Sequence, residues 1–519
     1  MKAPAARWRL LLAAAALVAA SFAAFGPALR AGFIFDDRWL IVDNAGVAGL
    51  DLARLRWMLS TNYLTTFMPL GWLLFAAIRA SRGLSPAAFH AAGLLLHGLV
   101  ATAFFEACRR LLRAAGQARA DGPAFAAALL FCVHPFMTSS AGWATELPDL
   151  ASTLLFLCAV AVYLGGRSRA RLTAVFLLYL LALLFRWKAV SLPIVLLVLD
   201  FWPLRRRAWL EKAPFFVLAA AAAALTAAAK SRIGYAAAWM PAASCRGLLL
   251  YCGALLWPFE QRALYALQSG GDALGVPAAL AVALVAAVTA LLWLRRRSWP
   301  AALGAWVCYA AAVAPPSLHA QGPFMFVFLP YGYLGALPLF ALASLGLVRL
   351  GRRGPKVLAA VTAAAALALG FYSRRESAYW RTGVSFWTHA VAVDRDCAVC
   401  RAELGHALLE AGRLNDAWFV LNAQLLYNPA DPVAVDNMAR LRAAAPDLAP
   451  DLPSFWISEA GDFLALGRAG DAKLLCARAL AKRPLWPAAQ ERMARAQEAL
   501  GDRPAAERHR RAAQRSVKS

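Results

Sequence analysis

Long apolar stretches constrain this chain more than any other feature. A helix that crosses a bilayer needs about 20 mostly apolar residues, within a range of about 17–25. Eleven stretches meet or approach this length, at residues 9–29, 87–108, 122–139, 148–165, 170–186, 189–204, 213–230, 276–295, 299–316, 325–348 and 356–373. We therefore predict an all-α fold whose main part is a polytopic membrane helix bundle of eleven spans. Two shorter apolar segments, 66–80 and 244–258, are predicted to be interfacial or re-entrant helices.

The charge distribution separates a membrane part from a water-soluble part. The formal net charge is +25, which in a soluble protein suggests nucleic acid. Residues 1–373 contain 33 bases and 12 acids, a net of +21, whereas residues 374–519 contain 21 bases and 17 acids, a net of +4. The bases are spread over short loops without a recognition motif, so we expect no nucleic-acid partner. We predict a transmembrane domain at 1–373, a linker and lead-in helix at 374–397, and a soluble domain at 398–519.

The positions of the bases also predict a topology. Lys and Arg accumulate in cytoplasmic loops. Of the 33 bases, 21 precede the first predicted span or follow the second, fourth, sixth, eighth and tenth. This alternation predicts a multi-pass protein of the inner (plasma) membrane with a cytoplasmic N-terminus and a periplasmic C-terminal domain. Residues 1–30 could instead be a cleaved signal peptide, but the ten following spans favour an uncleaved first helix.

The soluble tail has the pattern of tetratricopeptide (TPR) repeats, which are 34-residue helix pairs. One copy begins near Ala398 and a second near Pro453, and a degenerate third unit follows from about Trp486. Small residues stand at matching helix-packing positions, and a glycine marks each turn: Gly405, Ala417, Ala460 and Ala472, with Gly412 and Gly467. We predict a short TPR α-solenoid that binds a protein or peptide. The alternative is an unrelated helical bundle with coincidental spacing.

Cys397 and Cys400 are the only closely spaced cysteines among nine. On the non-cytoplasmic side they could form a disulfide. They could equally be two helical residues three positions apart, and the sequence leaves both alternatives open.

Adjacent acids open the first predicted outer loop. Asp36 and Asp37 follow directly after the first span. Two carboxylates in such a place could act as a general base or bind a divalent cation. The alternative is a solvated loop end in which Asp caps a helix. No other cofactor is expected.

Further polar residues are predicted to approach the same membrane surface. His90, His134 and Asp149 lie where the second, third and fourth spans reach the outer side. Ionisable residues that border an apolar domain are functional candidates. His97 lies deeper in the second span, where a hydrogen-bonded core histidine is the more common role.

Several motifs, each weak alone, occur in an order that resembles a known family. They are Asp36-Asp37 with Ile41-Val42-Asp43-Asn44, Phe89-His90 with Leu94-Leu95-Leu96-His97, His134-Pro135 with Trp143 and Asp149, Ala189-Val190-Ser191-Leu192-Pro193, and Ser385-Phe386-Trp387. The chain resembles the transmembrane-and-TPR-containing O-mannosyltransferases, which have the GT-C glycosyltransferase fold. The resemblance implies an enzyme that moves a sugar from a polyprenyl-phosphate donor to an acceptor outside the cytoplasm. It also implies that Asp36 or Asp37 is the catalytic base and that the tail holds the acceptor.

The sequence departs from the family pattern at several charged positions. Met68 replaces an Arg, Ser139 or Ser140 replaces a Glu, and Leu147-Pro148 stands where a base precedes the Asp of the fourth span. Arg186 and Lys188 remain as outer-surface bases and are the candidates for contact with the donor phosphate. The departures support an alternative, a catalytically inactive membrane-anchored TPR scaffold for protein–protein interaction. A transporter is a third hypothesis, disfavoured because no repeat relates the two halves of the membrane domain.

Overall fold

The computed structural model describes residues 3–231, 241–259, 261, 264–267, 276–317, 325–395, 397–446, 448, 452–465 and 467–518. The chain divides into two compact units, Met1–Cys397 and Ala398–Ser519. Each unit is helical, and the predicted all-α class is confirmed. The first unit is a multi-pass membrane protein by the length and apolar composition of its helices.

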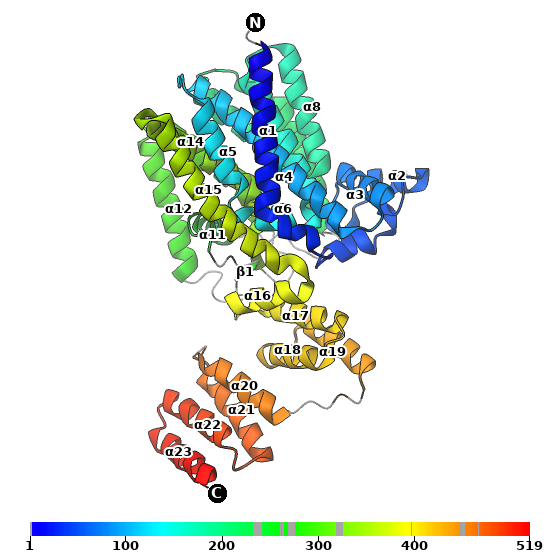
Figure 1. Ribbon diagram of the computed structural model, residues 1–519, viewed down its shortest axis with the longest axis vertical. Coiled ribbons are helices and arrows are strands. Elements are labelled where there is room, and N and C mark those ends of the chain that lie inside the picture. The colour runs from blue at the N-terminus through cyan, green and yellow to red at the C-terminus, as the bar shows by residue number, and fades with distance from the viewer. Residues whose placement is uncertain are drawn as a thin grey trace. The chain divides into compact units, whose positions relative to one another are not determined.

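Long helices run side by side through the first unit (Figure 1). They are α1 (Ala3–Phe25), α4 (Pro86–Ala114), α5 (Asp121–Cys132), α7 (Leu147–Leu164), α8 (Arg169–Phe185), α9 (Leu192–Phe201), α10 (Ala213–Ser231), α11 (Pro241–Leu256), α12 (Val276–Leu294), α13 (Pro300–Ser317), α14 (Tyr333–Arg353) and α15 (Pro355–Ala378). Four more helices belong to the unit: α2 (Leu52–Ser60), α3 (Pro69–Arg82), α6 (Thr138–Gly142) and α16 (Gly383–Val393). Every predicted span therefore contains a helix.

Not every predicted span is one continuous membrane-length helix. Within the described residues, seven helices are long and apolar enough to cross a bilayer, and an eighth is counted if the pair α5 and α6, bent by 55°, is one span. The fifth, sixth and ninth predicted spans correspond to α8, α9 and α13. At about 1.5 Å per residue, the ten residues of α9 cover only about half of a bilayer core. Beyond these eight, the count of eleven stays a prediction.

Close helix approach holds the bundle together. Leu, Ala and Phe side chains from most of these helices form one continuous buried core. At Gly98 of α4, a Cβ atom would lie 2.6 Å from the Cα of Val18 in α1, so only glycine permits this contact. The serine of α1, Ser21, donates its hydroxyl proton to the carbonyl of Leu94 at 2.8 Å. The first helix is thus packed into the bundle as an integral part of the unit.

The basic loops gather at one end of this bundle. Arg113 pairs with Asp121 at 2.8 Å, Arg110 donates to the carbonyl of Ala161 at 2.8 Å, and Arg352 donates to Gln117 at 3.4 Å. Arg167 also pairs with Glu211. These contacts join the loops that follow α4, α7, α9 and α14. The structure therefore brings together four of the six basic segments that the charge pattern assigns to the cytoplasm.

A small antiparallel ribbon is the exception to the helical architecture. Strand β1 (Leu264–Leu267) pairs with β2 (Met325–Phe328), with Leu264 opposite Phe328. The first four residues of the predicted tenth span, 325–348, are thus extended. Pro330 stands in the first turn of the short helix that follows, where proline is tolerated. A short helix, Leu329–Gly332, and then α14 follow.

The second unit consists of seven helices within the described residues. They are α17 (Ala398–Glu410), α18 (Leu414–Tyr427), α19 (Pro432–Ala444), α20 (Leu452–Ala465), α21 (Ala469–Lys482), α22 (Pro487–Ala499) and α23 (Arg503–Lys518). Gly412 and Gly467 have φ of 70° and 73°, the left-handed turn conformation that favours glycine. A Cβ at Gly405 would lie 2.3 Å from Leu421, so α17 and α18 approach closely there. The helix pairs and their turns lie where the repeat pattern places them, and the TPR assignment itself stays a prediction.

The cysteine alternatives are resolved in favour of the disulfide. Cys397 and Cys400 are both disulfide-bonded. The other seven cysteines are free thiols.

Candidate functional site

Asp37 is buried and anchors the first loop to the start of α7. One carboxylate oxygen, Oδ2, accepts a hydrogen bond from the backbone N–H of Ile34 at 3.0 Å. The other, Oδ1, accepts from the backbone N–H of Thr145 at 2.9 Å and from its hydroxyl at 2.5 Å. Burial raises the pKa of Asp37 to about 7, and these hydrogen bonds oppose the rise. Both oxygens are therefore engaged in holding the loop.

Asp36 has the opposite environment. Its side chain is half-buried, and its carboxylate forms no hydrogen bond or ion pair with any described residue. Burial raises its pKa to about 6, while the positive charge of Arg186 lowers it. A carboxyl group that titrates near neutral pH and has a free oxygen can accept a proton from a bound hydroxyl. Of the two predicted acids, Asp36 is the one with the geometry of a base.

Four buried charges form an ion cluster beside Asp36. Glu146 and Asp149 lie at the start of α7, and Arg186 and Lys188 lie in the turn between α8 and α9. Asp149 joins the two cations, because Oδ1 is 2.6 Å from Lys188 Nζ and Oδ2 is 2.9 Å from Arg186 Nε. Glu146 Oε2 is 4.0 Å from Lys188 Nζ. We call these four residues the buried ion cluster; its formal charges balance.

Two uncharged side chains complete the surroundings of the cluster. The Lys188 ammonium lies 4.2 Å from the ring centroid of Tyr331, a cation–π contact. Met68, at the start of α3, accepts a contact from Arg186 Nη1 to its sulfur at 3.1 Å. Met68 stands where the family resemblance expects an arginine, so the thioether replaces what would be a third cation.

The predicted histidines are bonded away from this cluster. His90 Nε2 is 3.3 Å from the carbonyl oxygen of Gly32, and His134 Nδ1 accepts from the backbone N–H of Phe136 at 3.2 Å. His97 is a buried core residue whose nitrogens contact Tyr333 Oη at 2.6 Å and the carbonyl of Cys132 at 2.9 Å. The structure thus brings Asp36, Asp149, Arg186 and Lys188 together. His90 and His134 support the backbone near them.

Sequence reasoning did not single out Glu146, Thr145 or Tyr331. Glu146 is three residues before Asp149, so both carboxylates lie on one side of the same helical turn. An ionisable residue at the start of a membrane helix was itself a detectable signal. Tyr331 directly follows Leu329-Pro330 in the sequence, but its contact with Lys188 joins segments distant in sequence. Only the tertiary structure shows that contact.

Aromatic rings border Asp36. Phe35 has a φ of 50°, an uncommon value for a residue with a side chain. Its ring stacks on Trp143 with centroids 5.9 Å apart and meets Trp387 edge-on at 5.3 Å. Such a strained residue persists only where its surroundings hold it. The conformation of Phe35 therefore contributes to the direction in which Asp36 leaves the loop.

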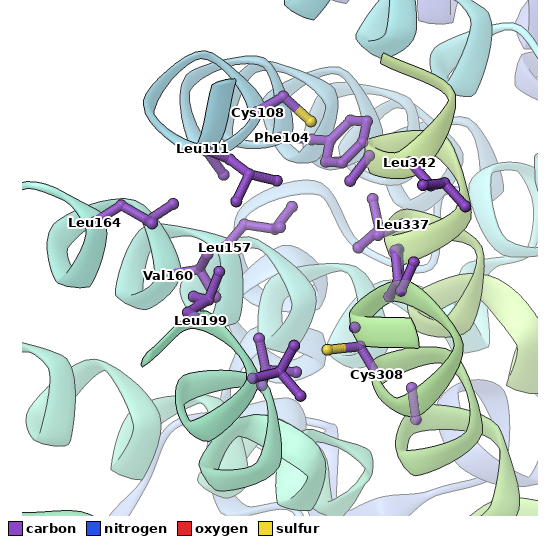
Figure 2. A pocket seen from close by; sticks show the side chains of 18 of the residues that line it. Phe104, Cys108, Leu111, Leu157, Val160, Leu164, Leu199, Cys308, Leu337 and Leu342 are labelled. Carbon is purple, nitrogen blue, oxygen red and sulfur yellow. The ribbon is translucent and has the colours of Figure 1, made fainter. Parts of the chain in front are cut away.

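An apolar groove begins next to the buried ion cluster and continues between the helices. Figure 2 shows its side chains from α4, α7, α9, α13 and α14 facing a common space. The cavity has a volume of about 110 Å³. Phe156, Ala312 and Leu334 line both this groove and a small pocket that contains Asp149 and Lys188. An apolar chain in the groove would therefore lead to Lys188 and its partner Asp149.

The described residues contain no group of three or more His, Cys, Asp or Glu side chains arranged to hold a metal ion. The charges of the cluster are instead arranged as ion pairs. Its two cations could bind an anionic group such as a phosphate, and Asp36 could accept a proton.

Three curated proteins are similar to part of the chain. The human protein O-mannosyl-transferase TMTC1 is 31% identical over 219 residues, which cover 38% of this chain and 24% of the relative. The mouse protein of the same name is 33% identical over 162 residues, covering 29% and 16%. A Drosophila melanogaster protein O-mannosyl-transferase, Tmtc1, is 29% identical over 184 residues, covering 33% and 21%. The chain thus spans about a quarter or less of the length of these relatives.

No family model matches the chain, and no solved structure matches it. The resemblance expected from the motifs is nevertheless confirmed by these relatives. This multi-pass membrane protein is, over about a third of its length, a divergent relative of proteins named protein O-mannosyl-transferases.

Proposed function

We propose that the chain is an integral-membrane glycosyltransferase that moves a sugar from a polyprenyl-phosphate donor to an acceptor on the non-cytoplasmic side. The observation that carries this proposal is that Asp36, whose carboxylate is free, lies within the electrostatic reach of Arg186, which shares the carboxylate of Asp149 with Lys188. The names of the relatives support hexosyl transfer and make mannose the first sugar to test.

The chemistry follows from the positions of these groups. Asp36 takes the proton of an acceptor hydroxyl as the acceptor oxygen bonds to the anomeric carbon of the sugar. The bond from that carbon to the phosphate oxygen breaks, and the lipid phosphate leaves with the electron pair. Arg186 and Lys188 stabilise the negative charge of the leaving phosphate. Asp37 is a positioning residue, because both of its oxygens already hold the loop.

The apolar groove supports a lipid-linked donor. A polyprenyl chain needs an apolar path within the membrane, and the groove supplies one that reaches Asp149 and Lys188. The second unit would hold a protein or peptide acceptor on its helix pairs, as the predicted TPR surface implies.

The decisive experiment compares Asp36→Asn with Asp43→Asn. Asp43 belongs to the same loop but is exposed and pairs with Arg38 at 2.9 Å on the surface. Cells that carry each variant are assayed for protein-bound mannose in the membrane and envelope fraction, with protein levels measured in parallel. We expect Asp36→Asn to reduce transfer by about 10²–10⁴-fold. Asp43→Asn should leave transfer nearly unchanged.

One observation favours the alternative, a catalytically inactive membrane-anchored scaffold. Asp149 already pairs with both cations of the cluster, at 2.6 Å and 2.9 Å. A scaffold predicts that Asp36→Asn leaves protein-bound mannose unchanged at wild-type protein levels. It also predicts that the second unit keeps its partners in that variant. That pair of results would exclude the glycosyltransferase.

A further inference from the structure

A second charged site lies at the opposite end of the first unit, among the basic loops. It is a cavity of about 460 Å³ between the α7–α8 loop and the α9–α10 loop. Its charged lining consists of four arginines and one acid: Arg167, Arg169, Arg171, Arg206 and Glu211. We call it the arginine pocket. It shares no lining residue with the apolar groove or with the small pocket at Asp149.

The arginine pocket has an excess of positive charge. Glu211 pairs with Arg167, which leaves the charges of three arginines without an acid in the lining. Arg171 donates to the carbonyl of Gly165, and the guanidinium of Arg206 lies 5.8 Å from the ring centroid of Tyr163. These contacts orient the two side chains but leave their charge uncompensated. The pocket therefore favours an anion.

A buried network fixes the floor of the pocket. Tyr163 donates its hydroxyl proton to Asp200 Oδ1 at 2.5 Å, and Lys212 pairs with Asp200 and donates to the carbonyl of Ala208 at 2.9 Å. Tyr163 and Ala208 are themselves lining residues. The backbone N–H of Arg206 donates to the carbonyl of Asp200 at 2.8 Å. The two loops that carry the arginines are thus held in one arrangement before any ligand binds.

Exposed apolar side chains are close in sequence to residues that line the pocket. Phe201, Trp209 and Leu210 are 58%, 66% and 71% exposed, and they flank Arg206 and Glu211 in sequence. Trp is enriched at the membrane–water interface. A ligand with an anionic head and apolar chains would match the arginines and these side chains together. A soluble phosphate would use the arginines alone.

We infer that the arginine pocket binds the phosphate headgroup of an anionic phospholipid, with acyl chains against Phe201, Trp209 and Leu210. Basic pockets between membrane helices at the cytoplasmic surface suit such headgroups. An arginine guanidinium can form two parallel hydrogen bonds with the oxygens of one phosphate, which makes the contact geometrically specific. The site would tie the loop ends of α7, α8, α9 and α10 to lipid at this surface.

The test uses the full-length chain in detergent, titrated with phosphatidylglycerol and followed by native mass spectrometry. The pocket variant replaces Arg169, Arg171 and Arg206 with alanine. The matched control replaces Arg295, Arg296 and Arg297, which follow α12, so that it removes the same charge from a different basic loop. We expect about a hundredfold weaker phosphatidylglycerol binding in the pocket variant, at about fivefold for each arginine. The control should weaken binding by no more than about threefold, because nonspecific attraction is screened by salt.

Two further measurements complete the test. The single variant Arg169→Glu changes an exposed residue and leaves the buried network intact. It should also weaken binding, and it replaces the triple variant in the test if the triple variant fails to fold. Inorganic phosphate at millimolar concentration should not displace the lipid, because it lacks acyl chains. Equal weakening in the pocket variant and the control would overturn the inference in favour of general charge attraction. Displacement of the lipid by inorganic phosphate would overturn it in favour of a soluble anion site.

Discussion

The buried ion cluster and the arginine pocket use the same kinds of side chain in opposite ways. In the cluster, two acids and two bases are buried and balanced, with Asp149 bridging both cations. In the arginine pocket, four bases face one acid in a largely exposed cavity. An unpaired charge that is buried away from water lowers stability strongly, whereas an unpaired charge that is exposed to water has little effect on stability. The comparison indicates that the cluster is stabilised by its internal ion pairs and that the excess positive charge of the pocket favours the binding of an external anion.

The largest expected effect comes from breaking the cluster at its bridging acid. Asp149→Asn leaves Arg186 and Lys188 buried without the carboxylate that joins them. We expect a loss of about 3–5 kcal/mol in the free energy of unfolding, as for other buried pairs that lose one partner. Thermal unfolding of the purified protein in detergent, followed by circular dichroism, measures it. A change below about 1 kcal/mol would mean that water reaches the cations and that the cluster is not buried in the membrane protein.

A smaller effect is expected from the hydrogen bonds that hold Asp37. Thr145→Val keeps the shape of the side chain and removes the hydroxyl that donates to Asp37 Oδ1. The expected destabilisation is about 1.5–3 kcal/mol, because the acceptor can be charged. Thr138→Val is the matched control, since the Thr138 hydroxyl donates to the neutral carbonyl of Pro135 at 2.7 Å. It should cost about 1 kcal/mol. Equal losses would show that Asp37 is neutral in the folded protein.

The pH dependence of transfer tests Asp36 as the base. Its pKa is raised to about 6, and only the ionised form can accept a proton. Transfer should therefore be constant above pH 7 and fall about tenfold per unit as the pH drops below 6. The measurement is kcat/KM against pH with a polyprenyl-phosphate mannose donor. A profile that stays flat down to pH 4.5 would contradict the role of Asp36.

The smallest effect is expected at the arginine pocket. Glu211→Gln removes the partner of Arg167, but the Arg167 side chain is 65% exposed. Surface ion pairs contribute little to stability, so the unfolding midpoint should barely move. The same change should strengthen phosphatidylglycerol binding, because it removes the one acid of the lining. Weaker lipid binding in this variant would contradict the view that the pocket attracts anions by its excess positive charge. It would make Glu211 a structural support of the pocket.

Much of the fold could be predicted because membrane helices and basic loops leave strong local signals. Long apolar stretches located a helix at every predicted span, and the alternating bases identified loops that the structure brings to one end. The breaks within spans were harder to predict. The bend between α5 and α6 and the ten-residue α9 depend on prolines and short helical turns whose effect is set by neighbouring helices.

The candidate site was only partly predictable. Asp36, Asp149, Arg186 and Lys188 were named from the sequence because charge next to an apolar span is uncommon. The different environments of the adjacent Asp36 and Asp37 were not predictable, since Thr145, 108 residues away, provides two of the hydrogen bonds to Asp37. The places of His90 and His134 likewise depend on which backbone groups the folded chain brings to them.

The sequence by itself determined that this is a membrane helix bundle followed by a second helical unit, because apolar length and charge alternation are local properties. It also supplied the resemblance to O-mannosyltransferases through short motifs. Only the tertiary structure decided which acid is free and which cations it faces. Burial, ion pairing and hydrogen bonding depend on side chains that meet from distant segments, and no local pattern records those meetings.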